Sequence, residues 1–191
     1  FYKVGDEFTS PVLYPTDAPT ILVFSDSGGY EDLMRGLAAS NYNSRYVIAV
    51  NGGKYIDNLS ETDFKNFDAI LLSSYDYKNE KKAMQLVSNF VKKGGKLFID
   101  TGAESKQSLA EKLPDIFPIK SSIREGLGRE WDLGVASDPI TEGVDFGKFS
   151  PPDFNGNDWK LAHPRHEGDI GAGAVTILKQ NGNPILVKAQ Y

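Results

Sequence analysis

Four short apolar runs, each followed by a loop rich in glycine or serine and then by a helical pattern, constrain this fold most strongly. The runs occupy 20–24, 46–50, 69–72 and 96–100. Apolar runs of this length are typical of strands that are buried on both faces, as in parallel sheets. Four β-loop-α units in series favour right-handed crossovers and helices on both faces of one sheet. We therefore predict an α/β fold with a flavodoxin-like, mostly parallel sheet.

Local signals mark the ends of the expected helices. Apolar residues recur at helical spacing over 30–38, which predicts an amphipathic helix after the first run. Ser60, followed three residues later by Asp63, predicts the N-cap of a second helix. Asn79 predicts the cap of a third helix, which we expect to end at Gly94.

The pattern changes in the C-terminal part of the chain. A last short helix is expected over 108–113, and the alternation of strands and helices is lost after Pro118. Two later strands are expected over 174–178 and 184–187, joined by an Asn-Gly turn at 181–182. We predict an antiparallel extension here.

Domain organisation follows from length and from the two ends. Residues 1–19 contain three prolines and are expected to form a linker or an edge segment. Residues 20–191 are long enough for one buried core, so a single domain is predicted there. Because the chain starts at Phe1 and stops just after the apolar run 184–187, we expect it to be a piece of a longer protein.

Charge and cysteine content exclude several functions. The formal charge is -5, and no basic stripe is available to neutralise phosphates, so no nucleic-acid partner is expected. The chain has no cysteine, which excludes disulfides, thiolate metal sites and cysteine nucleophiles.

A ligand site is expected where the carboxyl ends of the strands meet, because parallel α/β sheets bind ligands there. The candidate ligand-binding residues in the loops after the strands are Ser25, Ser27, Gly28, Gly29, Ser73, Ser74, Tyr75 and Gly102. Their backbone amides at helix starts suit an anion or an oxyanion. The alternative is that these glycines only form tight turns. The candidates for catalysis are Asp100, Thr101 and Glu104.

Several stretches resemble one known superfamily. They are 68–74 (Asp-Ala-Ile-Leu-Leu-Ser-Ser), 94–102 (Gly-Gly-Lys-Leu-Phe-Ile-Asp-Thr-Gly), 138–144 and 184–189. With them the chain resembles the class I glutamine amidotransferase-like superfamily, over roughly 20–104. The similarity is to its divergent, non-amidotransferase members, which are domains of larger surface or membrane proteins.

The resemblance has one important departure. Catalytic relatives place a cysteine at the elbow after the fourth strand, whereas this chain has Thr101 there, and a hydroxyl is a weaker nucleophile than a thiolate. Glutaminase activity is therefore not expected. The resemblance implies a non-catalytic ligand-binding or interaction domain of a larger, envelope-associated bacterial protein.

The sequence favours two kinds of partner and one competing function. The expected partner is a protein or a small molecule. The flanking regions of the full-length protein are expected as further partners, and a membrane anchor is one form that they could take. The competing function is a hydrolase of a carbohydrate-like or amide substrate that uses Asp100, Glu104 or the loop that contains His163 and His166.

The sequence also contains weak signals for a metal site and for a flavin site. His163 and His166 lie near two carboxylates, and the alternatives are a metal site or an exposed polar loop, with no metal expected. Arg165 replaces the glutamate of the family's His-Pro-Glu element. The loop 25–30 is loosely similar to a flavodoxin phosphate loop, but the carboxylate of Asp26 would repel a phosphate, so no cofactor is expected. Aromatic residues at 75, 77, 131 and 159 suit either sugar stacking or buried packing.

Overall fold

The computed structural model describes residues 17–26, 28–39, 47–101, 106–107, 112–148 and 160–191. The chain divides into two compact units, Phe1–Lys106 and Gln107–Tyr191. Two compact units can belong to one domain, so the single domain over 20–191 stays a prediction. The linker expected over 1–19 lies outside the described residues except for 17–19.

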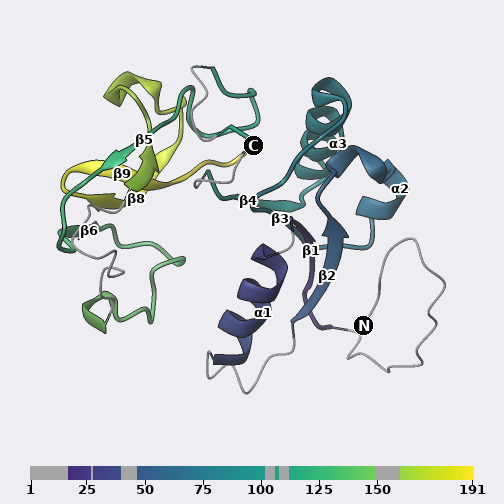
Figure 1. Ribbon diagram of the computed structural model, residues 1–191, viewed down its shortest axis with the longest axis horizontal. Helices are drawn as coiled ribbons and strands as arrows, with labels where there is room; N and C mark the ends of the chain where they lie inside the picture. Colours follow the sequence, from purple (N-terminus) through teal and green to yellow (C-terminus); the bar gives the residue numbers. More distant parts are fainter. Residues whose placement is uncertain (1–16, 27, 40–46, 102–105, 108–111, 149–159) are drawn as a thin grey trace. The chain divides into compact units, whose positions relative to one another are not determined.

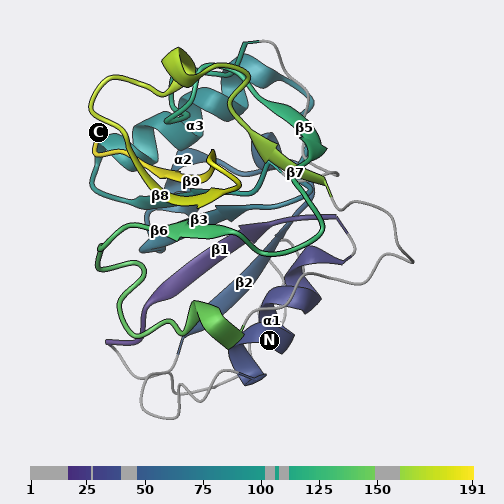
Figure 2. The ribbon, with the colours of Figure 1, turned by 90° about the vertical axis from the view of Figure 1, so that its left-hand side faces the viewer.

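The first unit contains a four-stranded, entirely parallel sheet in the order β2-β1-β3-β4. Its strands are β1 (Thr20–Phe24), β2 (Ile48–Gly53), β3 (Ala69–Leu72) and β4 (Lys96–Ile99). Figure 2 shows β2, β1 and β3 side by side in this order. The apolar side chains of Leu22, Val23 and Phe24 in the central strand β1 are completely buried. The predicted α/β class and the predicted parallel sheet are therefore confirmed.

Helices cover both faces of this sheet. Helix α1 (Gly29–Ala39) lies on one face, and α2 (Glu61–Phe64) and α3 (Glu80–Lys92) lie on the other (Figure 1). The chain moves from β1 to β2 in one direction and then to β3 and β4 in the opposite direction. Right-handed crossovers therefore place α1 on one face and the later helices on the other.

The core beneath α2 and α3 is aromatic. The ring of Phe64 lies 5.9 Å from that of Phe24 and 6.1 Å from that of Phe90. The buried residues of α3 are Ala83, Leu86, Val87 and Phe90. Each buried aromatic or leucine side chain of this kind contributes about 1.5–3 kcal/mol, so this contact fixes α3 on the sheet.

The predicted caps are confirmed. The carboxylate of Asp63 accepts from the backbone N–H of Ser60 at 2.7 Å and from its hydroxyl at 2.6 Å. The side chain of Asn79 accepts from the backbone N–H of Lys82 at 2.9 Å. After α3 the chain turns at Gly94, whose φ of 95° lies in the left-handed region that favours glycine.

The second unit is antiparallel. Strand β5 (Ile123–Gly126) pairs with β7 (Lys160–His163), and a separate three-stranded sheet has the order β6-β8-β9. Its strands are β6 (Leu133–Val135), β8 (Val175–Gln180) and β9 (Asn183–Lys188). Single turns of 3₁₀-helix occur at Ile56–Asn58 in the first unit and at Phe146–Lys148 and Glu167–Asp169 in the second.

The turn between β8 and β9 is the predicted one. Asn181 has a φ of 47° and Gly182 a φ of 81°, and two successive positive φ angles are required by a two-residue type I′ hairpin. The predicted antiparallel hairpin is confirmed. The helix expected over 108–113 lies mostly outside the described residues.

Candidate functional site

The strand order reverses between β1 and β3. The connection after β1 leads to β2 on one side, and the next strand, β3, lies on the other side of β1. Loops that leave two neighbouring parallel strands in opposite directions open a crevice at the carboxyl end of the sheet, which is the usual ligand position in such folds. The predicted ligand loops after β1 and β3 are therefore neighbours.

Backbone hydrogen bonds hold these two loops together. The N–H of Ser73 donates to the carbonyl of Phe24 at 2.9 Å, and the N–H of Asp26 donates to the carbonyl of Ser74 at 3.1 Å. Ser74 has a φ of 52°, which is uncommon for a residue other than glycine and often occurs near functional sites.

Ser25 places a buried hydroxyl beside these two loops. Its side chain is only 4% exposed, and among the described residues its Oγ has no hydrogen-bond partner. Leaving a buried hydroxyl without a partner costs about 1–3 kcal/mol, so a bound polar group at this position would be stabilised.

Gly29 explains why the hydroxyl of Ser25 fits there. A Cβ at Gly29 would lie 2.3 Å from Oγ of Ser25 and 3.4 Å from Oγ of Ser73. Gly29 is the first residue of α1, and the amino end of a helix offers unsatisfied N–H groups and a partial positive charge. The absence of a side chain at Gly29 thus lets two serine hydroxyls approach the start of α1.

Asp100 joins the same group of residues. The hydroxyl of Ser73 donates to Oδ2 of Asp100 at 3.2 Å, and the aspartate is exposed directly after β4. Thr101 is half-buried next to it. Of the predicted residues, the structure brings together Ser25, Gly29, Ser73 and Asp100.

Other predicted site residues are placed as follows. Tyr75 is only 1% exposed, so its ring packs in the core of the first unit. Gly28 is exposed next to Gly29. The positions of Ser27, Gly102 and Glu104 lie outside the described residues.

An ion pair that sequence reasoning did not predict lies in the loop after β3. Lys106 pairs with Asp76 at 2.8 Å, and its ammonium lies 5.3 Å from the ring centre of Tyr77. The hydrogen bond from Lys106 lowers the pKa of Asp76, and the same bond raises the pKa of Lys106. Asp76 and Lys106 are 30 positions apart in the sequence, so no local pattern predicts this contact.

The histidines belong to the second unit and have different surroundings. His163 is 5% exposed, its Nδ1 lies 2.7 Å from the carbonyl oxygen of Pro164, and its Nε2 lies 3.1 Å from Oε1 of Glu125. The backbone N–H of His166 donates to Asp169 at 3.2 Å. Within the described ranges, no group of three or more His, Cys, Asp or Glu side chains is arranged to hold a metal ion.

The part of the chain that the structure describes also contains no helix of the length and apolarity needed to cross a membrane.

The comparison with protein families gives a match over the middle of the chain. A family described as "Domain of unknown function (DUF8560)" matches residues 36–121, which contain β2, β3, β4 and α3. No curated protein and no solved structure matches the chain. The matched stretch includes Ser73 and Asp100 but not Ser25 or Gly29. The chain is thus similar to this family over the middle of its length, and its function has to be argued from the site.

Proposed function

We propose that the chain is a non-catalytic ligand-binding or interaction domain of a larger, envelope-associated protein, with its ligand at the carboxyl ends of β1 and β3. The observation that carries the proposal is the buried hydroxyl of Ser25, which has no partner among the described residues and lies against the start of α1. The strand order and the helices on both faces support a flavodoxin-like arrangement. The chain is proposed to be a divergent glutamine amidotransferase-like protein, and its lack of cysteine supports a non-catalytic role.

The charges around the crevice favour an uncharged, polar ligand. The carboxylates of Asp26 and Asp100 follow β1 and β4, at the edge where Ser25 and Ser73 present hydroxyls. Carboxylates repel a phosphate. Hydroxyl and amide groups of a ligand, in contrast, can donate hydrogen bonds to the two carboxylates, and they can both donate to and accept from a serine hydroxyl. We therefore propose a ligand that presents hydroxyl or amide groups, such as a sugar or a short peptide.

A ligand screen by nuclear magnetic resonance tests this proposal. The ¹⁵N-labelled chain is titrated with a panel of monosaccharides, amino acid amides and dipeptides. Binding at the proposed site shifts the amide signals of Ser25, Gly29 and Ser73. A panel member that binds but shifts only signals elsewhere, or a panel without any binder, would contradict the proposal.

Two glycine variants provide a matched pair for that screen. Gly29→Ala puts a methyl group against Oγ of Ser25 and is expected to abolish binding, whereas a Cβ at Gly28 meets no atom within 4 Å. Gly28→Ala is therefore expected to bind normally. Circular dichroism of both variants separates a loss of binding from a loss of folding.

The hydrolase remains the second candidate because Ser73 donates to Asp100. A carboxylate that accepts from a hydroxyl is a minimal arrangement for general-base catalysis. Hydrolysis of nitrophenyl glycosides or amino acid anilides by the native chain, lost in Asp100→Asn, would support it. Activity that is equal in both proteins would remove Asp100 from this role.

Envelope association is tested on the native gene product. Soluble and membrane fractions are blotted with an antibody raised against this chain. A band much larger than the chain in the membrane fraction supports the proposal. A soluble band of the size of this chain contradicts it.

A further inference from the structure

A cavity of about 380 Å³ lies between α2, the end of α3 and the amino ends of β3 and β4. Asp68 directly precedes β3 and Lys96 begins β4, so this cavity lies at the sheet edge opposite the serine crevice. Its lining residues all belong to the first unit. The cavity is therefore separate from the proposed ligand site.

The floor of the cavity is apolar and closely packed. It consists of Phe64, Leu86 and Phe90, which are buried, and of the half-buried Phe67. A Cβ at Gly95 would lie 2.3 Å from the ring of Phe90, so this ring rests directly on the glycine backbone. The rings of Phe64 and Phe90 meet edge to face at 69°, and an edge-to-face pair can receive a further aromatic ring in the same way.

The rim of the cavity carries charges of both signs. Three lysines (65, 93 and 96) and two carboxylates (61 and 68) line it, which gives a net charge of +1. Lys93 is ion-paired with Glu61. The carboxylate of Asp68 accepts from the backbone N–H of Thr20 at 2.8 Å and from its hydroxyl at 2.9 Å.

The two carboxylates thus have hydrogen-bonding partners, whereas Lys65 and Lys96 act on them only through charge: Lys65 helps to lower the pKa of Glu61, and Lys96 helps to lower that of Asp68. In the part of the chain that the structure describes, neither Lys65 nor Lys96 makes an ion pair. Because both lysines are exposed in the lining of the cavity, an incoming negative charge would meet two ammonium groups above the aromatic floor.

We infer that this cavity binds a small aromatic carboxylate, with its ring on Phe64, Phe67 and Phe90 and its charge between Lys65 and Lys96. Ligand pockets usually have volumes of about 300–1,000 Å³, so a cavity near the lower limit fits a ligand of one or two rings. The lysine charges favour an anion over a neutral ligand, and the apolar floor favours a ligand with an aromatic ring. This inference concerns a site on the opposite edge of the sheet and does not depend on the function proposed above.

The test uses 2-naphthoate and its uncharged analogue 2-naphthamide. Each is titrated into the ¹⁵N-labelled 191-residue chain. We expect saturable shifts of the amide signals of Phe67 and of residues 93–96 with naphthoate, and weaker binding of the amide. Shifts confined to other residues, no saturation, or equal affinity for both compounds would overturn the inference.

Charge variants make the test specific. Lys65→Gln and Lys96→Gln are each expected to weaken naphthoate binding by roughly two- to fivefold, the effect of losing one exposed ion pair, and to leave naphthamide binding unchanged. Lys81→Gln removes an exposed lysine of α3 that does not line the cavity and should change neither. Unchanged naphthoate binding in both rim variants would contradict the role of the lysines. All three positions are exposed, so the variants are expected to fold.

Discussion

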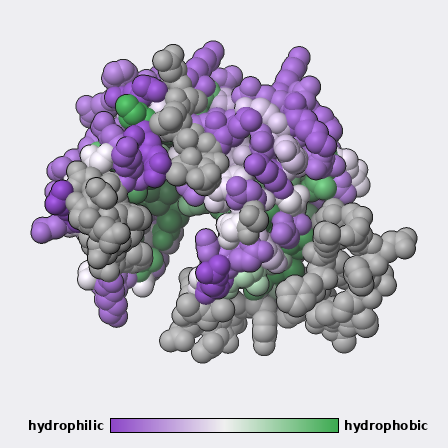
Figure 3. Space-filling model, in the orientation of Figure 1, coloured by the Kyte–Doolittle hydropathy of each residue, from purple (hydrophilic) through white to green (hydrophobic). Residues whose placement is uncertain are grey.

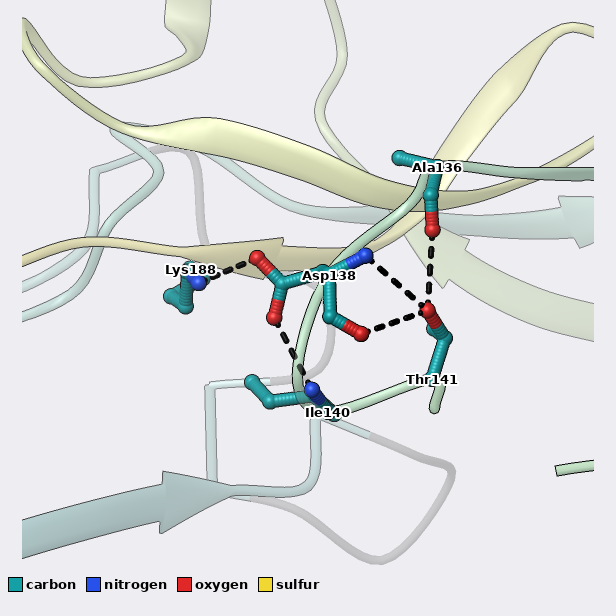
Figure 4. Close-up of polar contacts among 5 residues, drawn as sticks. All are labelled: Ala136, Asp138, Ile140, Thr141 and Lys188. Carbon is teal, nitrogen blue, oxygen red and sulfur yellow. Dashed lines mark hydrogen bonds and ion pairs between the residues drawn. The ribbon is translucent and has the colours of Figure 1, made fainter. Parts of the chain in front are cut away.

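The ammonium group of Lys188 in β9 donates a hydrogen bond to the carboxylate of Asp138 and forms an ion pair with it, although Asp138 lies 50 residues earlier in the chain (Figure 4). The other oxygen of Asp138 accepts from the backbone N–H of Ile140 at 3.0 Å. The hydroxyl of Thr141 donates to the carbonyl of Ala136 at 2.9 Å. The stretch 138–144, one of those that carry the family resemblance, therefore includes a turn that is fastened to β9.

Stability is expected to fall in acid because of this ion pair. The hydrogen bond from Lys188 lowers the pKa of Asp138 in the folded protein. A depressed folded-state pKa gives stability that is present above the unfolded value, near 4, and is lost as the pH falls through the folded value. Urea unfolding midpoints measured from pH 7 to pH 3 should decrease below about pH 5, and less steeply in Asp138→Asn.

Other carboxylates with a lowered pKa also lose their contribution to stability as the pH falls. Asp138→Asn should therefore remove only part of the decrease in stability in acid. These carboxylates are Asp57, Glu61, Asp63, Asp68, Asp76 and Asp169. Identical slopes for Asp138→Asn and the native chain would show that the Lys188 contact has no part in acid unfolding.

The buried amide of Gln180 should contribute strongly to the second unit. Its Nε2 donates to the carbonyls of Leu127 at 3.1 Å and Glu130 at 2.8 Å, and its Oε1 accepts from the N–H of Asp132 at 3.1 Å. Gln180→Met leaves these backbone groups without their partner and is expected to cost about 1–3 kcal/mol in urea unfolding. Gln85 is exposed, so Gln85→Met should change stability by less than about 0.5 kcal/mol.

The carboxylate of Asp57 should be equally important in the first unit. Its two oxygens accept from the backbone N–H groups of Lys78 at 2.9 Å and Asn79 at 2.8 Å, just before α3. Burial raises the pKa of Asp57, but these hydrogen bonds outweigh burial, and the net effect is a lowered pKa. Asp57→Ala is expected to cost about 1–3 kcal/mol, measured by thermal or urea unfolding.

Glu31→Gln is the control for Asp57, because Glu31 is an exposed acidic residue in the first turn of α1. It should change stability by less than about 0.5 kcal/mol. Equal losses in Asp57→Ala and Glu31→Gln would show that burial and backbone hydrogen bonds at Asp57 do not matter.

Gly29 and Ser25 should be energetically coupled. Gly29→Ala forces a methyl group to within 2.3 Å of Oγ of Ser25, so we expect a destabilisation of about 1–3 kcal/mol. In Ser25→Ala that oxygen is gone, and the same glycine change should cost less. A double-mutant cycle measured by urea unfolding should therefore give a non-additive result, whereas additive losses would mean that the two side-chain positions do not meet.

Much of the first sheet follows from local sequence. The runs 20–24 and 69–72 form strands with the predicted bounds, and Ser60 and Asn79 cap helices as predicted. Strand neighbours do not follow from such runs, because an apolar run indicates burial but not the strand that covers it. Phe98, within the run 96–100 in the edge strand β4, is 54% exposed, so this run did not indicate burial on both faces.

The candidate site was predicted only in outline. The loops after the strands were expected to meet, but the burial of Ser25 depends on the missing side chain of Gly29, and only the folded chain shows this. The lysines that line the cavity beside α2 and α3 are up to 31 positions apart in the sequence, and α2, α3 and β4 bring them together. Asp57 lies 21 residues from the first of its two donors, so no local motif identified its role.

At the start of α3, a side chain of the protein itself occupies the position of a bound anion. Asp57 places a carboxylate on the N–H groups of Lys78 and Asn79, where a free acid would otherwise bind. Truncation to glycine would leave these two N–H donors without their carboxylate. A single codon change could thus turn a structural contact into a receptor for acetate or formate, and added acetate would then restore part of the lost stability.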